Sequence, residues 1–134
     1  MSLSFHIDFN GQCNQAFEFY EKNLGATIGT MLKFKDSPAS SSVPSDWQKK
    51  IVHANIAIGE VELAGADVLP EHYQKPSGFY LLLGVSTEKS VNLIFNTLSS
   101  GGDVILAPQK TFWSPCYAVT VDQFGVPWKI NCGA

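Results

Sequence analysis

The chain has few charged residues, few cysteines and no long apolar run. Of its 134 residues only 16% are charged, and the formal net charge is −3. Nucleic-acid-binding domains need a basic footprint, and no cluster of lysine or arginine supplies one here. No apolar run approaches the roughly 20 residues that a transmembrane helix requires. We therefore expect neither a nucleic acid nor a membrane as partner.

The three cysteines, Cys13, Cys116 and Cys132, are an odd number without paired spacing. They predict neither a disulfide framework nor a zinc knuckle. The first ten residues show no secretory signal, because they lack a basic stretch followed by a long apolar one. Together these features predict a cytoplasmic protein. Nothing in the sequence around Cys116 would activate its thiol, so we expect no nucleophilic role for it.

The clearest element is a β-hairpin near the end of the chain. Residues 117–121 are small or β-branched, which is typical of a half-buried strand, and residues 122–125 (DQFG) can form the turn. In the second strand, residues 126–131, apolar and polar side chains alternate. We therefore predict that Trp128 lies in the core and that Lys129 lies on a polar face.

Residues 51–66 repeat this hairpin, with Gly59 in the turn and His53 on the polar face of the first strand. An amphipathic helix and another strand precede each hairpin. The remaining helices and strands are expected at residues 3–9, 12–24, 26–34, 79–85, 88–98 and 104–107. The order is therefore strand, helix and three strands, twice over. A solenoid would need at least about three repeats, so the pattern indicates a duplicated unit.

This order predicts an α+β fold made of two tandem βαβββ modules. At 134 residues and 45% hydrophobic content the chain is long enough for one domain with a substantial core. We expect a single domain over residues 1–134, with modules at about 1–70 and 77–134. Each module is expected to pack one helix on the apolar face of its sheet, which leaves the polar faces of the two sheets to line a cup.

Residues 35–50, KDSPASSSVPSDWQKK, are rich in serine and contain two prolines. Such a segment buries little apolar surface. It is either a mobile loop or a lid over a site, since long loops in compact domains are often functional.

Four stretches together resemble the PhnB-like branch of the vicinal oxygen chelate superfamily, which includes glyoxalase I, bleomycin-resistance proteins and extradiol dioxygenases. They are FNGQCNQAFEFYEKNLGA (9–26), IVHANIAIGEVELAGAD (51–67), QKTFW (109–113) and DQFGVPWKIN (122–131). The resemblance covers both modules. It implies the glyoxalase/bleomycin-resistance fold, in which the modules form a cupped, half-open barrel.

For the enzymes of the superfamily the resemblance also implies a divalent metal such as Zn, Ni, Mn or Fe, which activates two neighbouring substrate oxygens. A His or Glu on the first strand and a Glu on the last strand of each module hold it. In this chain the first module offers His6 and Glu62. The second module offers side chains that do not usually bind divalent metals: Phe79 or Tyr80, and Lys129 or Asn131. Two of the four ligand positions are therefore filled.

His53 is either a hydrogen-bonded structural histidine or a contact to metal or substrate, because neutral imidazole suits both uses. Glu62 shares its face with Glu60, and two solvated carboxylates are the ordinary explanation. If that face lines the cup, Glu62 becomes a metal ligand or a catalytic general base.

Trp113 and Tyr117 are large amphipathic rings beside the second hairpin. We predict that they contact substrate at the wall of the cup, while a dimer contact stays open for Trp113. Lys129 would hold an anionic substrate if its face lines the cup, and is otherwise a solvated lysine.

Two functions remain open. The first is a binding or sequestering protein for a small organic molecule, without a complete four-ligand metal site. The second is a divalent-metal-dependent isomerase, lyase or dioxygenase. A methyltransferase is not expected, because the chain lacks a glycine-rich strand-to-helix turn for a nucleotide-like cofactor. A homodimer is expected, because it would cover sheet edges and apolar surface.

Overall fold

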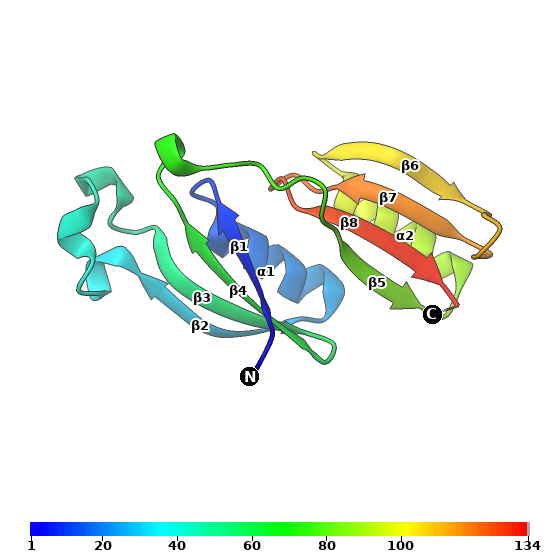
Figure 1. The fold of residues 1–134 in the computed structure, drawn as a ribbon, viewed down its shortest axis with the longest axis horizontal. Helices are drawn as coiled ribbons and strands as arrows, with labels where there is room; N and C mark the ends of the chain where they lie inside the picture. The colour runs from blue at the N-terminus through cyan, green and yellow to red at the C-terminus, as the bar shows by residue number, and fades with distance from the viewer. Residues whose placement is uncertain (134) are drawn as a thin grey trace. The chain divides into compact units, whose positions relative to one another are not determined.

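The computed structural model describes residues 1–133 and divides the chain into two compact units, Met1–Gln74 and Lys75–Ala134 (Figure 1). The first unit contains β1 (Phe5–Phe9), α1 (Cys13–Leu24), β2 (Thr27–Lys33), β3 (Ile51–Ile58) and β4 (Val61–Asp67). The second contains β5 (Leu81–Val85), α2 (Glu88–Ser99), β6 (Asp103–Gln109), β7 (Tyr117–Val121) and β8 (Pro127–Cys132). The predicted α+β fold with two tandem βαβββ modules is confirmed. No helix in the described part of the chain is long and apolar enough to cross a membrane.

The two sheets share one topology. The strand order is β1-β4-β3-β2 in the first sheet and β5-β8-β7-β6 in the second (Figure 1). In each sheet the first and last strands of the module are parallel, and the other neighbours are antiparallel. The last strand of each module therefore lies in the middle of its sheet. Pro127 is tolerated in this position because it is the first residue of β8.

In the first unit, α1 packs its predicted apolar stripe against the sheet. Phe17 and Tyr20 are fully buried, and the ring of Phe17 meets that of Phe9 edge to face at 5.7 Å. Gly65 on β4 permits this approach, because a Cβ there would lie 2.7 Å from the Phe17 ring. The helix ends as predicted at Gly25, whose left-handed backbone (φ 67°) suits glycine.

In the second unit, α2 begins at Thr87, whose hydroxyl oxygen accepts the backbone N–H of Ser90 at 3.0 Å. This is the predicted N-cap. Val91 and Leu98 are fully buried on the face of the helix that packs on the sheet. Trp128 is 1% exposed, so its predicted place in the core is confirmed.

Each unit contains one buried aspartate that the sequence analysis did not identify. Asp67 accepts the backbone N–H groups of Cys13 (2.9 Å) and Ile51 (2.8 Å), and so joins the start of α1 to the start of β3. Burial raises the pKa of the Asp67 carboxyl, against the lowering effect of these N–H donors. In the second unit Asp122 accepts two backbone N–H groups of the β7–β8 turn and the indole N–H of Trp128.

Residues 35–50 are more regular than the sequence suggested. They lie across three short 3-10 helices, η1 (Phe34–Asp36), η2 (Ser40–Ser42) and η3 (Ser45–Trp47). The side-chain amide of Gln48 holds this segment together, because it donates to the backbone oxygens of Ser40 (2.7 Å) and Val43 (3.2 Å). Whether this segment acts as a lid stays a prediction.

The strand boundaries differ from the predicted ones by a few residues. The first strand begins at Phe5 rather than at residue 3, and the fifth at Leu81 rather than at residue 79. β6 is longer than predicted and runs through Pro108. Because β6 is the edge strand of its sheet, Pro108 does not interrupt a ladder on both sides.

Candidate functional site

Each sheet has one face covered by the helix of its own unit and one face without a helix, called here the open face. In the first sheet, strand alternation and register place polar side chains on the open face. They are His6 and Asp8 on β1, Glu62 on β4, and His53 and Asn55 on β3. Three of these, His6, Glu62 and His53, are the residues that the sequence analysis selected in this module.

His6 and Glu62 lie on adjacent strands. His6 pairs with Ala64, and Glu62 stands two residues before Ala64 on the same face, so the two side chains are diagonal neighbours. The Nε2 atom of His6 lies 2.8 Å from Asp8 Oδ1, and both side chains are 51% exposed. Asp8 was missed by the sequence analysis, although its i+2 spacing from His6 already placed both on one face.

His53 lies apart from this pair. Glu62 pairs with Ala57, four residues along β3 from His53, which is about 14 Å along the strand at roughly 3.4 Å per residue. Between them Asn55 has a structural role, because its Oδ1 accepts the backbone N–H of Thr30 at 2.6 Å within the irregular part of β2. The structure therefore brings His6 and Glu62 together, but not His53.

A complete metal centre does not fit the described residues. Across residues 1–133, no three His, Cys, Asp or Glu side chains converge on a position that could hold a metal ion. Catalytic zinc sites typically use three protein ligands. His6 and Glu62 therefore stay predicted ligands, and no third His, Cys, Asp or Glu side chain joins them among the described residues.

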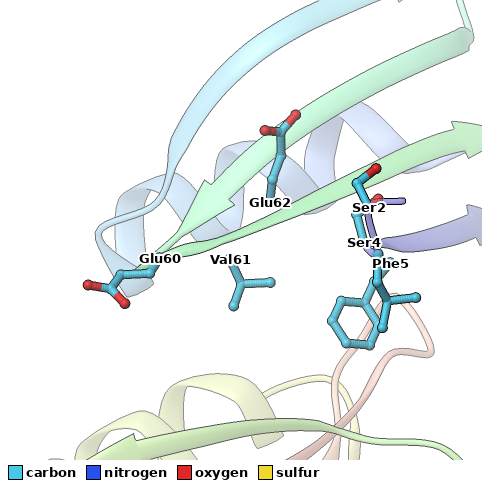
Figure 2. A pocket seen from close by; sticks show the side chains of 7 residues that line it. Ser2, Ser4, Phe5, Glu60, Val61 and Glu62 are labelled. Carbon is cyan, nitrogen blue, oxygen red and sulfur yellow. The ribbon is translucent and has the colours of Figure 1, made fainter.

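The first unit has an open pocket of about 520 Å³ beside β1 and the β3–β4 turn (Figure 2). Its lining consists of Ser2, Leu3, Ser4, Phe5, Glu60, Val61 and Glu62. Figure 2 shows Glu62 and Val61 projecting to opposite sides of β4, so carboxylates and apolar groups both border the space. No basic side chain lines it. The pocket is therefore acidic and partly apolar.

The open face of the second sheet has a different chemistry. Lys129 and Asn131 project from β8 on this face, while Trp128 and Ile130 face the core. The Nζ atom of Lys129 lies 4.6 Å from the centroid of the Tyr80 ring, a cation–π contact. The cation is therefore held at the surface without a carboxylate partner among the ion pairs of the described residues.

Aromatic rings gather around Tyr117, which lies on the same face of the sheet as this lysine. The rings of Trp113 and Tyr117 meet at 5.2 Å, and those of Phe112 and Trp113 at 4.7 Å. Tyr117 pairs with Asn131 across the β7–β8 ladder, so it shares a face with Lys129. Phe112, Trp113 and Tyr117 are called here the aromatic cluster. Phe112 is 98% and Trp113 55% exposed, so apolar surface is available there.

No protein-family model matches the chain. Solved structures of low identity show its fold. The PhnB protein of Bacillus cereus is 16% identical over 99% of this chain and 100% of that one, with a TM-score of 0.85. The fosfomycin resistance protein FosX of Listeria monocytogenes is 8% identical over 100% of this chain and 93% of FosX. A glyoxalase-related enzyme of Fulvimarina pelagi is 13% identical over 99% of this chain and 89% of that enzyme. Both have TM-scores of 0.67.

Two relatives of higher identity decide the family. Protein PA1353 of Pseudomonas aeruginosa is 35% identical over 98% of this chain and 97% of that one, with a TM-score of 0.87. Protein YjdN of Escherichia coli K12 is 32% identical over 139 residues, which cover 98% of this chain and 95% of YjdN. The chain belongs to the PhnB-like family of the vicinal oxygen chelate superfamily. The resemblance in the sequence is thereby confirmed.

A metal is present elsewhere in the superfamily. A second FosX structure, 7% identical with a TM-score of 0.67, contains Mn(II) and a dihydroxypropylphosphonic acid. At that identity it shares only the fold with this PhnB-like chain. The described residues of this chain contain no corresponding group of ligands.

The structure therefore sorts the predicted site residues of this PhnB-like protein into separate groups. Trp113, Tyr117 and Lys129 lie at the open face of the second sheet. His6, Glu62 and His53 belong to the first sheet. Sequence reasoning did not assign a role to Tyr80, because its contact with Lys129 joins residues far apart in the chain.

Proposed function

We propose that this PhnB-like protein binds a small organic molecule on the open face of its second sheet, without a complete four-ligand metal centre. One observation carries the proposal. On β8, the strand that supplies a Glu ligand in the superfamily's enzymes, the open face bears Lys129, and Tyr117 of the aromatic cluster lies on the same face. A cation beside exposed aromatic rings suits an anionic group attached to an apolar or aromatic body.

Lys129 is the anchor for the anionic group. The Tyr80 ring holds its ammonium by a contact that leaves the positive charge uncompensated. Trp113 and Tyr117 would then contact the body of the ligand, because aromatic faces offer large contact area with few rotatable bonds. His53 is exposed on β3 of the first unit, and it stays a separate predicted ligand contact that is not part of this site.

The alternative is a divalent-metal-dependent isomerase, lyase or dioxygenase. It would use His6 and Glu62 as ligands, with Glu62 also as the catalytic base. The contact between His6 Nε2 and Asp8 works against it, because a metal at that nitrogen would have to displace Asp8. A cofactor such as Zn, Ni, Mn or Fe therefore belongs to the alternative only.

The same proposal includes a cytoplasmic homodimer. All three cysteines are free and buried, as expected for a reducing compartment. Each sheet has edge strands, β1 and β2 in the first and β5 and β6 in the second, which a second copy could cover. Sedimentation equilibrium over a range of concentrations measures the oligomeric state, and a monomer throughout would contradict the dimer.

The test begins with metal-stripped protein. Calorimetric titration with zinc, nickel and manganese is run beside a thermal-shift screen of small organic acids, amines and neutral compounds. We expect stabilisation by acids, lost in Lys129→Met and retained in the matched control Lys89→Met on α2. Stoichiometric metal binding that His6→Ala and Glu62→Gln both remove would overturn the proposal in favour of the alternative.

A further inference from the structure

The side-chain oxygen of Asn131 is buried and has no hydrogen-bond partner among the described residues. Buried polar atoms in folded proteins are paired as a rule, and an unpaired one destabilises the fold. The only other such atom in the described part of the chain is Nε1 of Trp47, in the first unit. Asn131 lies two residues from Lys129 on the same face of β8 and therefore belongs to the candidate site.

The strands beside Asn131 explain why none of the described residues pairs with its oxygen. Across the ladder Asn131 pairs with Tyr117 on β7 and with Gly84 on β5. Gly84 has no side chain, and the Tyr117 ring is in contact with Trp113. Lys129 lies two residues away on the same face, about 7 Å along the strand, and its ammonium is over Tyr80. Among the described residues, therefore, no donor in this row reaches the amide oxygen of Asn131.

We propose that Asn131 determines the specificity of the site by accepting a hydrogen bond from the bound molecule. The inference rests on the proposed function, because it needs a ligand held by Lys129. Together the two residues select an organic acid that carries an O–H or N–H donor a few bonds from its charged group. Because of the aromatic cluster, we expect this acid also to carry an apolar or aromatic body.

The oxygen can reach such a ligand. Asn131 as a whole is only partly buried, although its oxygen is closed off from solvent. The terminal torsion of an asparagine side chain is soft, with a broad distribution of angles. Rotation about this torsion exchanges the amide nitrogen and oxygen and turns the oxygen towards a molecule on the open face, while Lys129 moves from Tyr80 to the anionic group.

Mandelate and phenylacetate test the inference, because they differ only in one hydroxyl group beside the carboxylate. In a second pair, 4-hydroxybenzoate and benzoate, the hydroxyl group is on the ring, opposite the carboxylate. Calorimetry measures each dissociation constant for the metal-stripped wild type. We expect at least one hydroxylated acid to bind about fivefold or more tightly than its partner, as one buried hydrogen bond predicts. In Asn131→Leu the ratio should fall to about one, and in the control Asn92→Leu, on α2, it should not change.

Other outcomes overturn the inference in distinguishable ways. If both acids of each pair bind equally and Lys129→Met weakens all four, Asn131 does not select the ligand, yet the proposed function stands. If none of the four binds at millimolar concentration, the ligand class is wrong, and the wider screen decides the proposed function.

A ligand-free measurement separates specificity from structure. Replacing an unpaired buried oxygen by an apolar group of similar size removes an unfavourable term, so the urea midpoint of Asn131→Leu should equal or exceed that of the wild type. A lower midpoint would show that the amide supports the fold, and would overturn the inference.

Discussion

The indole N–H of Trp128 donates to Asp122 Oδ2 at 2.9 Å, and both residues are buried, with exposures of 1% and 3%. The other carboxylate oxygen of Asp122 accepts the backbone N–H groups of Phe124 and Val126 at 2.9 and 3.0 Å. One carboxylate therefore fixes both the β7–β8 turn and the largest core side chain. The strand that follows carries Lys129 and Asn131 to the open face.

This relationship predicts that Asp122→Asn destabilises the protein by about 2 kcal/mol. The amide oxygen can still accept from the turn, but the amide N–H₂ would then face the indole N–H, and one donor would stay unpaired. Urea unfolding of Asp122→Asn, Trp128→Phe and the double variant measures the coupling. Additive effects of the two changes would contradict the inferred hydrogen bond.

Asp67 predicts a pH dependence of stability. Burial raises the pKa of its carboxyl above the ordinary value of 3.8, so between that value and the raised one the native state holds a proton that the unfolded state has released. The unfolding free energy contributed by Asp67 is then greatest below pH 3.8 and falls as the pH rises through the raised pKa.

The measurement is the difference in unfolding free energy between the wild type and Asp67→Asn across this pH range. We expect the unfolding free energy of the wild type, relative to that of Asp67→Asn, to decrease with rising pH and then to level off. An advantage that grows with pH would mean that the N–H donors of Cys13 and Ile51 outweigh desolvation. Asp46→Asn, an exposed position in η3, is the control.

The cysteines should be unreactive in the folded protein. All three are buried, and burial raises the pKa of the Cys13 and Cys116 thiols. Because the thiolate is the reactive form, labelling by a thiol-specific disulfide reagent should be slow under native conditions. In concentrated denaturant three equivalents should react within seconds to minutes. Rapid native labelling of Cys13, located by peptide mapping, would contradict the packing of α1 on its sheet.

Gly65 predicts a packing effect. An added Cβ would lie 2.7 Å from the Phe17 ring and 3.2 Å from Cys13 Sγ, so Gly65→Ala should destabilise the protein by about 1–3 kcal/mol through overpacking. Chemical denaturation measures the change. Ala57→Ser, on the open face of the neighbouring strand, should be within about 0.5 kcal/mol of the wild type. Equal stability of both variants would show that α1 does not press on β4.

The sequence was sufficient for the βαβββ order and for the side of each strand that faces the core. These properties follow from periodicities of 2 and 3.6 residues, which relate close neighbours in the chain. For that reason Trp128 could be predicted inside and Lys129 outside from alternation alone. The stop at Gly25 and the cap at Thr87 were predictable because they depend on single residues at helix ends.

Only the tertiary structure decided which of these residues meet. Strand register separates His53 from Glu62 and brings Tyr80 to Lys129, and it leaves the oxygen of Asn131 without a partner among residues 1–133. Asp67 joins Cys13 and Ile51, which lie 54 and 16 residues away in the chain. Such contacts depend on the packing and hydrogen bonding of many distant residues at once, so no local pattern encodes them.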